Sequence, residues 1–170
     1  MSWKSRYRQK ILREKAAGVK RSVQLCPVGK VHEIGILWQG ADREAFSFLT
    51  EYFQAQKIVL RHLCYCDKTE TLESGVITRK SCNWLGFPQG EEVEAFMGSK
   101  FDLLINLSVI PCFPLEVVTA LSHATFKIGW ALSDDNWFDL SVDVTKRPEA
   151  LYLAEQIILY IEQLTKKTTV

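Results

Sequence analysis

Long apolar segments are absent from this chain of 170 residues. No run approaches the roughly 18–20 residues that cross a bilayer, so the sequence predicts no stable membrane insertion. Hydrophobic residues make up 47% and charged residues 24% of the chain, close to the averages for globular proteins, which excludes a chain disordered throughout. The length favours a single domain with a substantial buried core.

Cysteines are odd in number, which argues against a disulfide framework. The five are Cys26, Cys64, Cys66, Cys82 and Cys112. The start of the chain is basic, as in a secretory signal, but its longest apolar stretch is only residues 16–19. Reduced thiols and a cytoplasmic location are therefore predicted.

Motifs for the common cofactors and for catalysis are also missing. After the first predicted strand, the segment 39–43 has one glycine where a dinucleotide-binding loop needs three. The chain has no P-loop and no nucleophile elbow. We predict no cofactor and no catalytic residue, so an enzymatic role is left open but is not favoured.

One group of residues resembles a metal site. His62, Cys64 and Cys66 alternate along a predicted strand, so their side chains could converge on one face. Zinc sites usually space paired cysteines more widely and add a second pair, which this sequence lacks. We predict no metal, and we interpret these residues as packing at a strand end. Cys112 precedes a predicted helix and could have a lowered thiol pKa, but packing beside its neighbours is favoured.

Positive charge is concentrated at the start of the chain. Residues 1–22 carry a net charge of +7 and the other 148 residues a net charge of −6, counting only Lys, Arg, Asp and Glu. The bases of this segment are Lys4, Arg6, Arg8, Lys10, Arg13, Lys15, Lys20 and Arg21. Such asymmetry indicates contact with nucleic acid or an anionic surface. We define residues 1–22 as a basic N-terminal helical arm and residues 23–170 as a single α/β domain.

A narrow apolar stripe runs along this predicted helix. Trp3, Tyr7 and Ile11 follow at intervals of four residues. The stripe is wide enough to dock the arm on the domain, or to stack Trp3 and Tyr7 on bases of a nucleic acid. It is thin for a membrane-surface helix, which is our third hypothesis. A solvated arm that only aids solubility is the alternative without function. We also expect residues 1–22 to be removable without loss of the fold, since the first strand begins near Ile34.

Predicted strands and helices alternate through the rest of the chain. The strands are expected at residues 34–38, 58–63, 75–79, 101–107, 126–130 and 138–144, and the helices at 43–55, 91–97, 115–124 and from 148 onward. The segment 101–107 is apolar on both faces, as expected at the centre of a parallel sheet. This pattern predicts a three-layer α/β sandwich with a mainly parallel sheet of about five strands, similar to Rossmann or flavodoxin folds.

Three spaced stretches carry a resemblance to a known family. They are 34–37 (IGIL), 83–88 (NWLGFP) running into 101–105 (FDLLI), and 124–129 (ATFKIG), after a start rich in Lys and Arg. Together they resemble a family of short Bacteroidetes proteins classed as a domain of unknown function. The resemblance implies a bacterial cytoplasmic protein and supplies no activity or site residue.

In open α/β sheets, ligands bind beyond the carboxyl ends of the strands. A ligand there would contact Gly40, Arg43, Asn106 or Ser108. The favoured hypothesis is a non-enzymatic module whose basic arm contacts a polyanion such as RNA or a ribonucleoprotein. The alternative is a small-molecule-binding protein or enzyme that uses this cleft.

Overall fold

A computed structural model describes residues 1–68 and 74–168 of the protein. The described residues form one open, all-parallel sheet in the order β3-β2-β1-β4-β5-β6. The strands are β1 (Glu33–Gln39), β2 (Val59–Tyr65), β3 (Val76–Ile77), β4 (Leu103–Asn106), β5 (Lys127–Gly129) and β6 (Leu140–Ser141). The predicted parallel α/β class is confirmed, with six strands where about five were expected.

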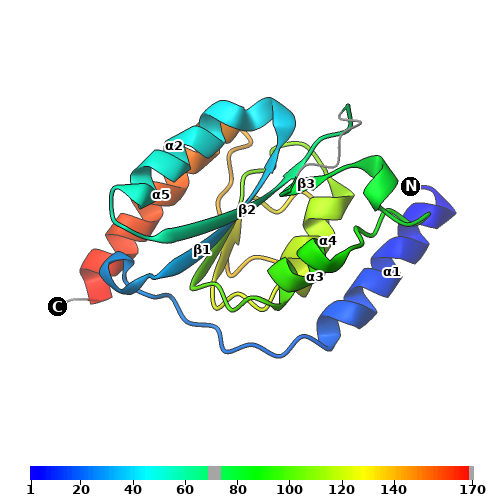
Figure 1. Ribbon diagram of the computed structural model, residues 1–170, viewed down its shortest axis with the longest axis horizontal. Coiled ribbons are helices and arrows are strands. Elements are labelled where there is room, and N and C mark those ends of the chain that lie inside the picture. Colours follow the sequence, from blue (N-terminus) through cyan, green and yellow to red (C-terminus); the bar gives the residue numbers. More distant parts are fainter. Residues whose placement is uncertain (69–73, 169–170) are drawn as a thin grey trace.

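Helices cover both faces of this sheet (Figure 1). The helices of the described residues are α1 (Trp3–Ala17), α2 (Arg43–Gln54), α3 (Glu91–Gly98), α4 (Phe113–Leu121) and α5 (Ala150–Thr168). On one face, the helices α2 and α5 pack on Ile34 and Ile36 of β1. On the other face, α3 and α4 pack on Leu37 of β1 and Leu104 of β4. Alternate strand residues thus serve opposite halves of the core, as strand geometry requires.

Strand β4 lies in the interior of the sheet, between β1 and β5. All four of its residues are buried, and Ile105 has no exposed surface. This confirms the prediction of a central strand within residues 101–107. The apolar residues of this segment fit that position, because a strand covered by helices on both sides buries every side chain.

Several expected elements differ in extent from those observed, and the strands expected at 75–79, 101–107 and 126–130 are shorter in the structure. The half-exposed segment 138–144 contributes only two residues to β6. The helix expected from residue 148 onward begins at Ala150, and it buries Leu153 fully but Leu151 only partly. Among the described residues, every helix is too short or too polar to cross a membrane.

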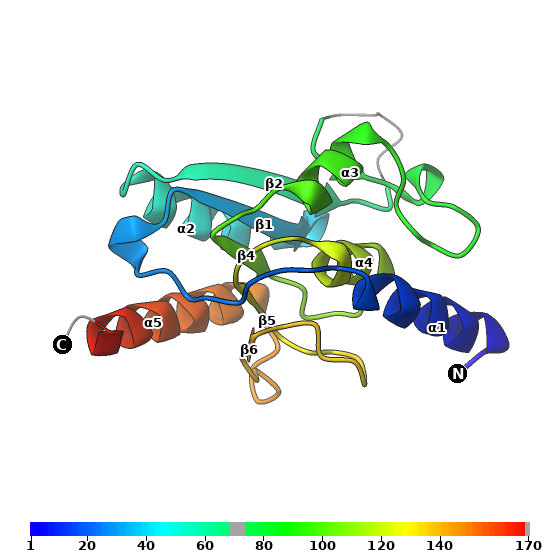
Figure 2. The ribbon, with the colours of Figure 1, turned by 90° about the horizontal axis from the view of Figure 1, so that it is seen from below.

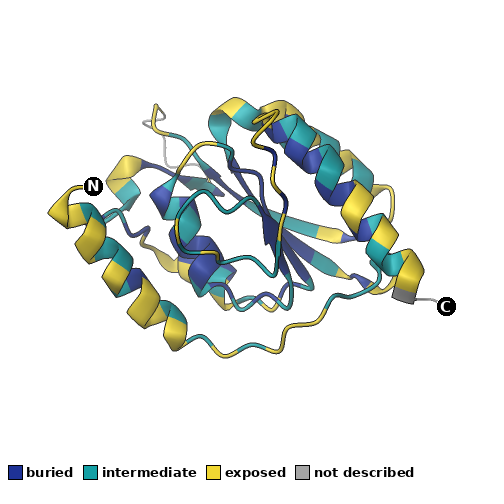
Figure 3. Cartoon of the chain, turned by 180° about the vertical axis from the view of Figure 1, so that it is seen from behind, coloured by how far each residue is buried: buried dark blue, intermediate teal, exposed yellow. Residues whose placement is uncertain are grey.

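Helix α1 forms an additional layer outside α4 (Figure 2). A third apolar cluster joins the two helices, and it contains Leu12, Leu85, Phe87, Phe113, Val117 and Ala120. From α1 the chain crosses an edge of the molecule before entering β1 (Figure 2). Much of α1 faces solvent, which leaves its outer side available for contacts (Figure 3).

Candidate functional site

Helix α1 packs on the domain through Leu12, with Ile11 and Ala16 partly buried beside it. Leu12 is fully buried among the side chains of Phe87 and Phe113 and their neighbours. Successive residues of an α-helix are about 100° apart, so Leu12 and Trp3 lie on opposite sides of α1. The docked side therefore runs through Leu12, and Trp3 and Tyr7 of the predicted stripe face away from the domain.

A polar network reinforces this docking. The Glu116 carboxylate of α4 accepts hydrogen bonds from the Gln9 side chain (3.2 Å), the Ser133 hydroxyl (2.9 Å) and the Trp137 indole (3.0 Å). The Arg13 guanidinium pairs with Asp135, at 2.9 Å from Nε to Oδ1. Side-chain atoms from α1 thus meet acids on two other segments of the chain, which aligns the helix as well as attaching it.

Because of these contacts, we no longer expect residues 1–22 to be removable without loss of stability. Leu12→Ala should lower the free energy of unfolding by about 2–5 kcal/mol, because it removes buried methyl groups and leaves a cavity between α1 and α4. Urea unfolding measures the change, with the exposed Lys15→Ala as the matched control. Equal stability of the two variants would mean that residues 1–22 are removable after all.

The bases of residues 1–22 fall into two groups. Five are exposed and make no ion pair among the described residues: Lys4, Arg6, Lys10, Lys15 and Lys20. The other three are used against the body of the protein. Arg13 pairs with Asp135, Arg21 with Asp139, and the Arg8 guanidinium stacks over the Phe113 ring, 4.1 Å from its centroid.

Exposed aromatic side chains accompany the free bases. Trp3 is 66% exposed, Tyr7 47% and Trp84 65%. The Lys4 ammonium lies 5.9 Å from the centroid of the Trp84 ring, so the loop that carries Trp84 adjoins α1. We call Trp3, Lys4, Arg6, Tyr7, Lys10 and Trp84 the outer face. No single stretch of sequence indicated Trp84 as part of it, because 81 residues separate Trp84 from Trp3.

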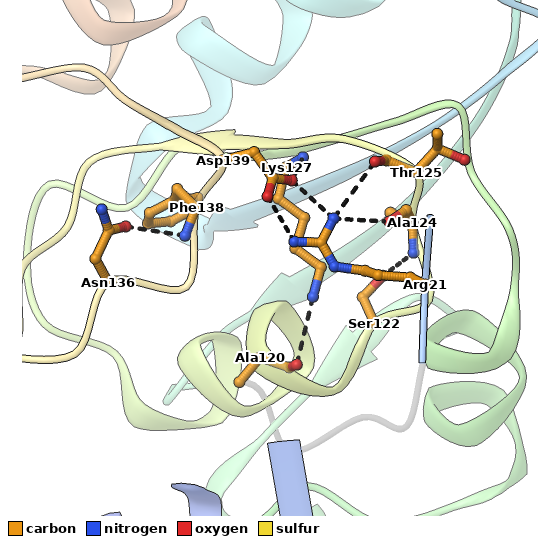
Figure 4. Close-up of polar contacts among 9 residues, drawn as sticks. All are labelled: Arg21, Ala120, Ser122, Ala124, Thr125, Lys127, Asn136, Phe138 and Asp139. Carbon is orange, nitrogen blue, oxygen red and sulfur yellow. Dashed lines mark hydrogen bonds and ion pairs between the residues drawn. The ribbon is translucent and has the colours of Figure 1, made fainter. Parts of the chain in front are cut away.

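A partly buried polar cluster fastens the segment after α1 (Figure 4). The Arg21 guanidinium donates two hydrogen bonds of 2.7 Å to the Asp139 carboxylate. Asp139 also accepts the backbone N–H of Lys127 at 2.8 Å. The Lys127 side chain donates to the carbonyl of Ala120 at 3.3 Å, and Lys127 is only 2% exposed. Burial first, and the nearby Arg21 charge second, lower the pKa of Lys127 to about 7.

A crevice opens at the carboxyl edge of the sheet. The strand order reverses between β1 and β4, and the side chain of Gln39 bridges this point by donating to the carbonyl of Ile110 at 2.9 Å. The crevice has a volume of about 760 Å³. Its lining is Arg8, Gln39, Gly40, Ala41, Tyr65, Cys66, Asp67, Lys68, Pro111, Cys112, Phe113 and Pro114. Ligands of open α/β sheets bind at such a reversal point.

The four predicted cleft residues are not brought together. Gly40 lines the crevice, while the Arg43 guanidinium lies 5.5 Å from the Trp38 ring. Asn106 and Ser108 line a separate cavity of about 50 Å³, where the buried Ser108 hydroxyl has no partner among the described residues. The Asn106 side chain donates to the Thr119 hydroxyl and accepts the Ser108 backbone N–H. A space this small suits water rather than a metabolite.

The thiols at this edge of the sheet are poor nucleophiles. Burial raises the pKa of Cys64 and Cys82 to about 11 and that of Cys112 to about 12. The possibility of a lowered Cys112 pKa is therefore wrong, because burial outweighs the helix N-terminus beside it. His62 accepts the Trp38 indole N–H at 3.3 Å, and burial lowers its pKa. Within residues 1–68 and 74–168, no three His, Cys, Asp or Glu side chains are grouped as metal ligands would be.

Fold and site together define a parallel α/β protein with a basic helix docked beside the carboxyl-edge crevice. The chain belongs to a family of unknown function, DUF6913, whose model matches residues 4–164. The predicted resemblance to a family of unknown function is confirmed at that level. Comparison with curated proteins and with solved structures gave no match.

Proposed function

We propose that this protein is a non-enzymatic binding module that holds a polyanion, such as single-stranded RNA, on the outer face. The supporting observation is the presence of exposed aromatic rings next to unpaired bases: Trp3 and Tyr7 are neighbours on α1, and Trp84 lies beside Lys4. Aromatic rings stack on bases, and lysine and arginine side chains neutralise phosphates. Surfaces that bind single strands without strong sequence preference combine these two features.

The structure narrows the set of bases in this proposal. Arg13 and Arg21 already have carboxylate partners, and Arg8 lies against Phe113 on the docked side of α1. Lys4, Arg6 and Lys10 of the outer face remain as phosphate contacts, and the exposed Lys15 and Lys20 extend this set along the arm. The proposed unit is the arm of residues 1–22 together with the loop that carries Trp84, supported by the α/β domain of residues 23–170.

Binding of single-stranded RNA should weaken steeply with salt. If all five exposed bases contact phosphates, the plot of log affinity against log salt concentration should have a slope of about −3.5. Replacing Arg6 and Lys10 with Ala should flatten the slope by about 1.4, since two counterion-releasing contacts are lost. Trp3→Ala should weaken binding by about 1–3 kcal/mol through lost stacking. Fluorescence anisotropy of a labelled oligonucleotide at several salt concentrations measures all three.

A matched control distinguishes RNA binding at the outer face from nonspecific attraction to any exposed base. Lys146→Ala removes an exposed base from a different segment of the chain and should leave the slope unchanged. Equal effects of Lys146→Ala and Arg6→Ala would contradict the outer face. Retention on anionic vesicles without RNA binding would favour contact with a membrane surface instead.

A second candidate function is small-molecule binding or catalysis in the carboxyl-edge crevice. It is favoured by the crevice volume and by its position where the strand order reverses. The order β3-β2-β1-β4-β5-β6 is also that of doubly wound dinucleotide-binding sheets, which supports a Rossmann-like layering. From the sequence resemblance we further infer a cytoplasmic protein of Bacteroidetes.

A further inference from the structure

We propose that the carboxyl-edge crevice binds a small molecule carrying one phosphate group, and that Arg8 contacts this phosphate. The inference deepens the second candidate function, because it names a ligand class and a residue for the crevice. It does not depend on RNA binding by the outer face.

The Arg8 guanidinium is held in place by Phe113 and by the backbone at Gly86. Its guanidinium stacks on Phe113 at 4.1 Å, and its Nη1 atom lies 3.7 Å from the position that a Cβ would occupy at Gly86. Gly86 has a φ of +93°, a conformation that residues other than glycine rarely adopt. Without a side chain at this position, the backbone can lie close to the Arg8 guanidinium. Stacking fixes the plane of the guanidinium without using its N–H donors.

Arg8 also lacks a counter-charge. Its Nε atom is shielded from solvent and has no hydrogen-bond partner among the described residues, and none of their carboxylates pairs with the guanidinium. Arg13 and Arg21, from the same arm, each meet an aspartate. A partly buried cation without an acid is costly, and an anionic ligand in the crevice would offset that cost.

The chemistry of the crevice favours a phosphate. A guanidinium binds phosphate through two parallel N–H donors. Lys68 adds a second cation, so the lining holds two cations against the one Asp67 carboxylate, which accepts a hydrogen bond from the Tyr65 hydroxyl at 3.2 Å. Cys112 stays protonated, because burial raises its pKa to about 12, so it brings no negative charge.

The rest of the lining limits the size and character of the ligand. The rings of Tyr65 and Phe113, with Pro111, offer apolar contact for an aromatic group. The volume of about 760 Å³ falls within the usual range for small-molecule sites. The turn at Gly40 lacks the glycines that admit a pyrophosphate of a dinucleotide, so Arg8 takes the place of a phosphate-binding loop. A nucleoside monophosphate combines the required phosphate and ring.

Calorimetric titration of the full chain with AMP, and separately with adenosine, tests the proposal. We expect saturable one-to-one binding of AMP and no binding of adenosine at the same concentrations. Arg8→Gln should weaken AMP binding at least tenfold. Arg6→Gln, on the outer face of the same helix, should bind AMP like the unaltered protein. Equal weakening by Arg6→Gln and Arg8→Gln, or no AMP binding by the unaltered protein, would overturn the proposal.

A second pair of variants guards against misfolding of the Arg8 variant. Ala41 is exposed and lines the crevice, so a longer side chain there does not disturb the core. Ala41→Glu should abolish AMP binding by repulsion, whereas the neutral Ala41→Gln should retain most of it. If both the Ala41→Glu and the Ala41→Gln protein bind AMP, the proposal is also overturned. Trp3→Ala should weaken RNA binding but leave AMP binding unchanged, so failure of one proposal is distinguishable from failure of the other.

Discussion

Ile105→Asp is expected to leave the protein unfolded at 25 °C. Ile105 lies in β4, paired with Ile36 of β1 and Ile128 of β5, and has no exposed surface. An aspartate there would be a buried charge with no partner, and the helices on both faces exclude water. The cost of several kcal/mol for such a charge, added to the lost packing, is comparable to the total stability of about 5–15 kcal/mol typical of a domain. Circular dichroism and a proton–nitrogen correlation spectrum would show the loss of structure.

Two further variants make this result specific to the site. Val59→Asp places the same charge on β2 at an exposed position and should change stability by about 0.5 kcal/mol or less. Ile105→Val should cost about 0.5–1.5 kcal/mol. A folded Ile105→Asp protein would contradict the position of β4 in the centre of the sheet.

Lys127→Met should stabilise the protein at pH 6, by at most about 5 kcal/mol, the free energy that corresponds to the change in pKa. Burial and the nearby Arg21 charge lower the pKa of Lys127 from 10.5 to about 7 in the folded state. Below pH 7, both the folded and the unfolded state carry the charge, so folding bears the full cost of burying it. A methionine has a similar shape and no charge, and it loses the hydrogen bond to Ala120 and the attraction of the Asp139 carboxylate.

The pH dependence follows from the sign of that change. Between pH 7 and 10.5, the unfolded state binds the proton and the folded state does not, so the stability of the unaltered protein rises with pH. The advantage of Lys127→Met should therefore shrink steadily from pH 7 to pH 10. Urea unfolding of both proteins at pH 6 and pH 9.5 measures it, because other titrating groups cancel in the difference. A constant advantage at both pH values would show that Lys127 is charged throughout, and the exposed Lys146→Met should show no advantage at either.

The two proposed binding surfaces share one helix. The outer face of α1 carries Trp3, Arg6 and Lys10, and its docked side presents Arg8 to the crevice. A change that detaches α1, such as Leu12→Ala, would therefore disturb both surfaces at once. Single substitutions on opposite sides of the helix are the better way to separate the two functions.

The sequence alone determined the order and kind of the main elements. Apolar residues recur at helical spacing in 43–55, alternate or run continuously in the strands, and reach both faces in 101–107. These patterns are local, because each element must present its apolar side to a core, and their alternation in turn predicts a parallel sheet. The sequence also shows that residues 1–22 are basic and the remaining residues acidic, because counting charged residues requires no structure.

Only the tertiary structure decided which residues of the basic arm are free. Arg8, Arg13 and Arg21 look alike in sequence, yet one lies on a phenylalanine and two meet aspartates more than 100 residues away. The crevice is likewise assembled from four separate segments, and the buried Lys127 lies beside a salt bridge between Arg21 and Asp139, which are far apart in sequence. Contacts between residues distant in sequence depend on how the elements pack, and periodicity within one element carries no information about them.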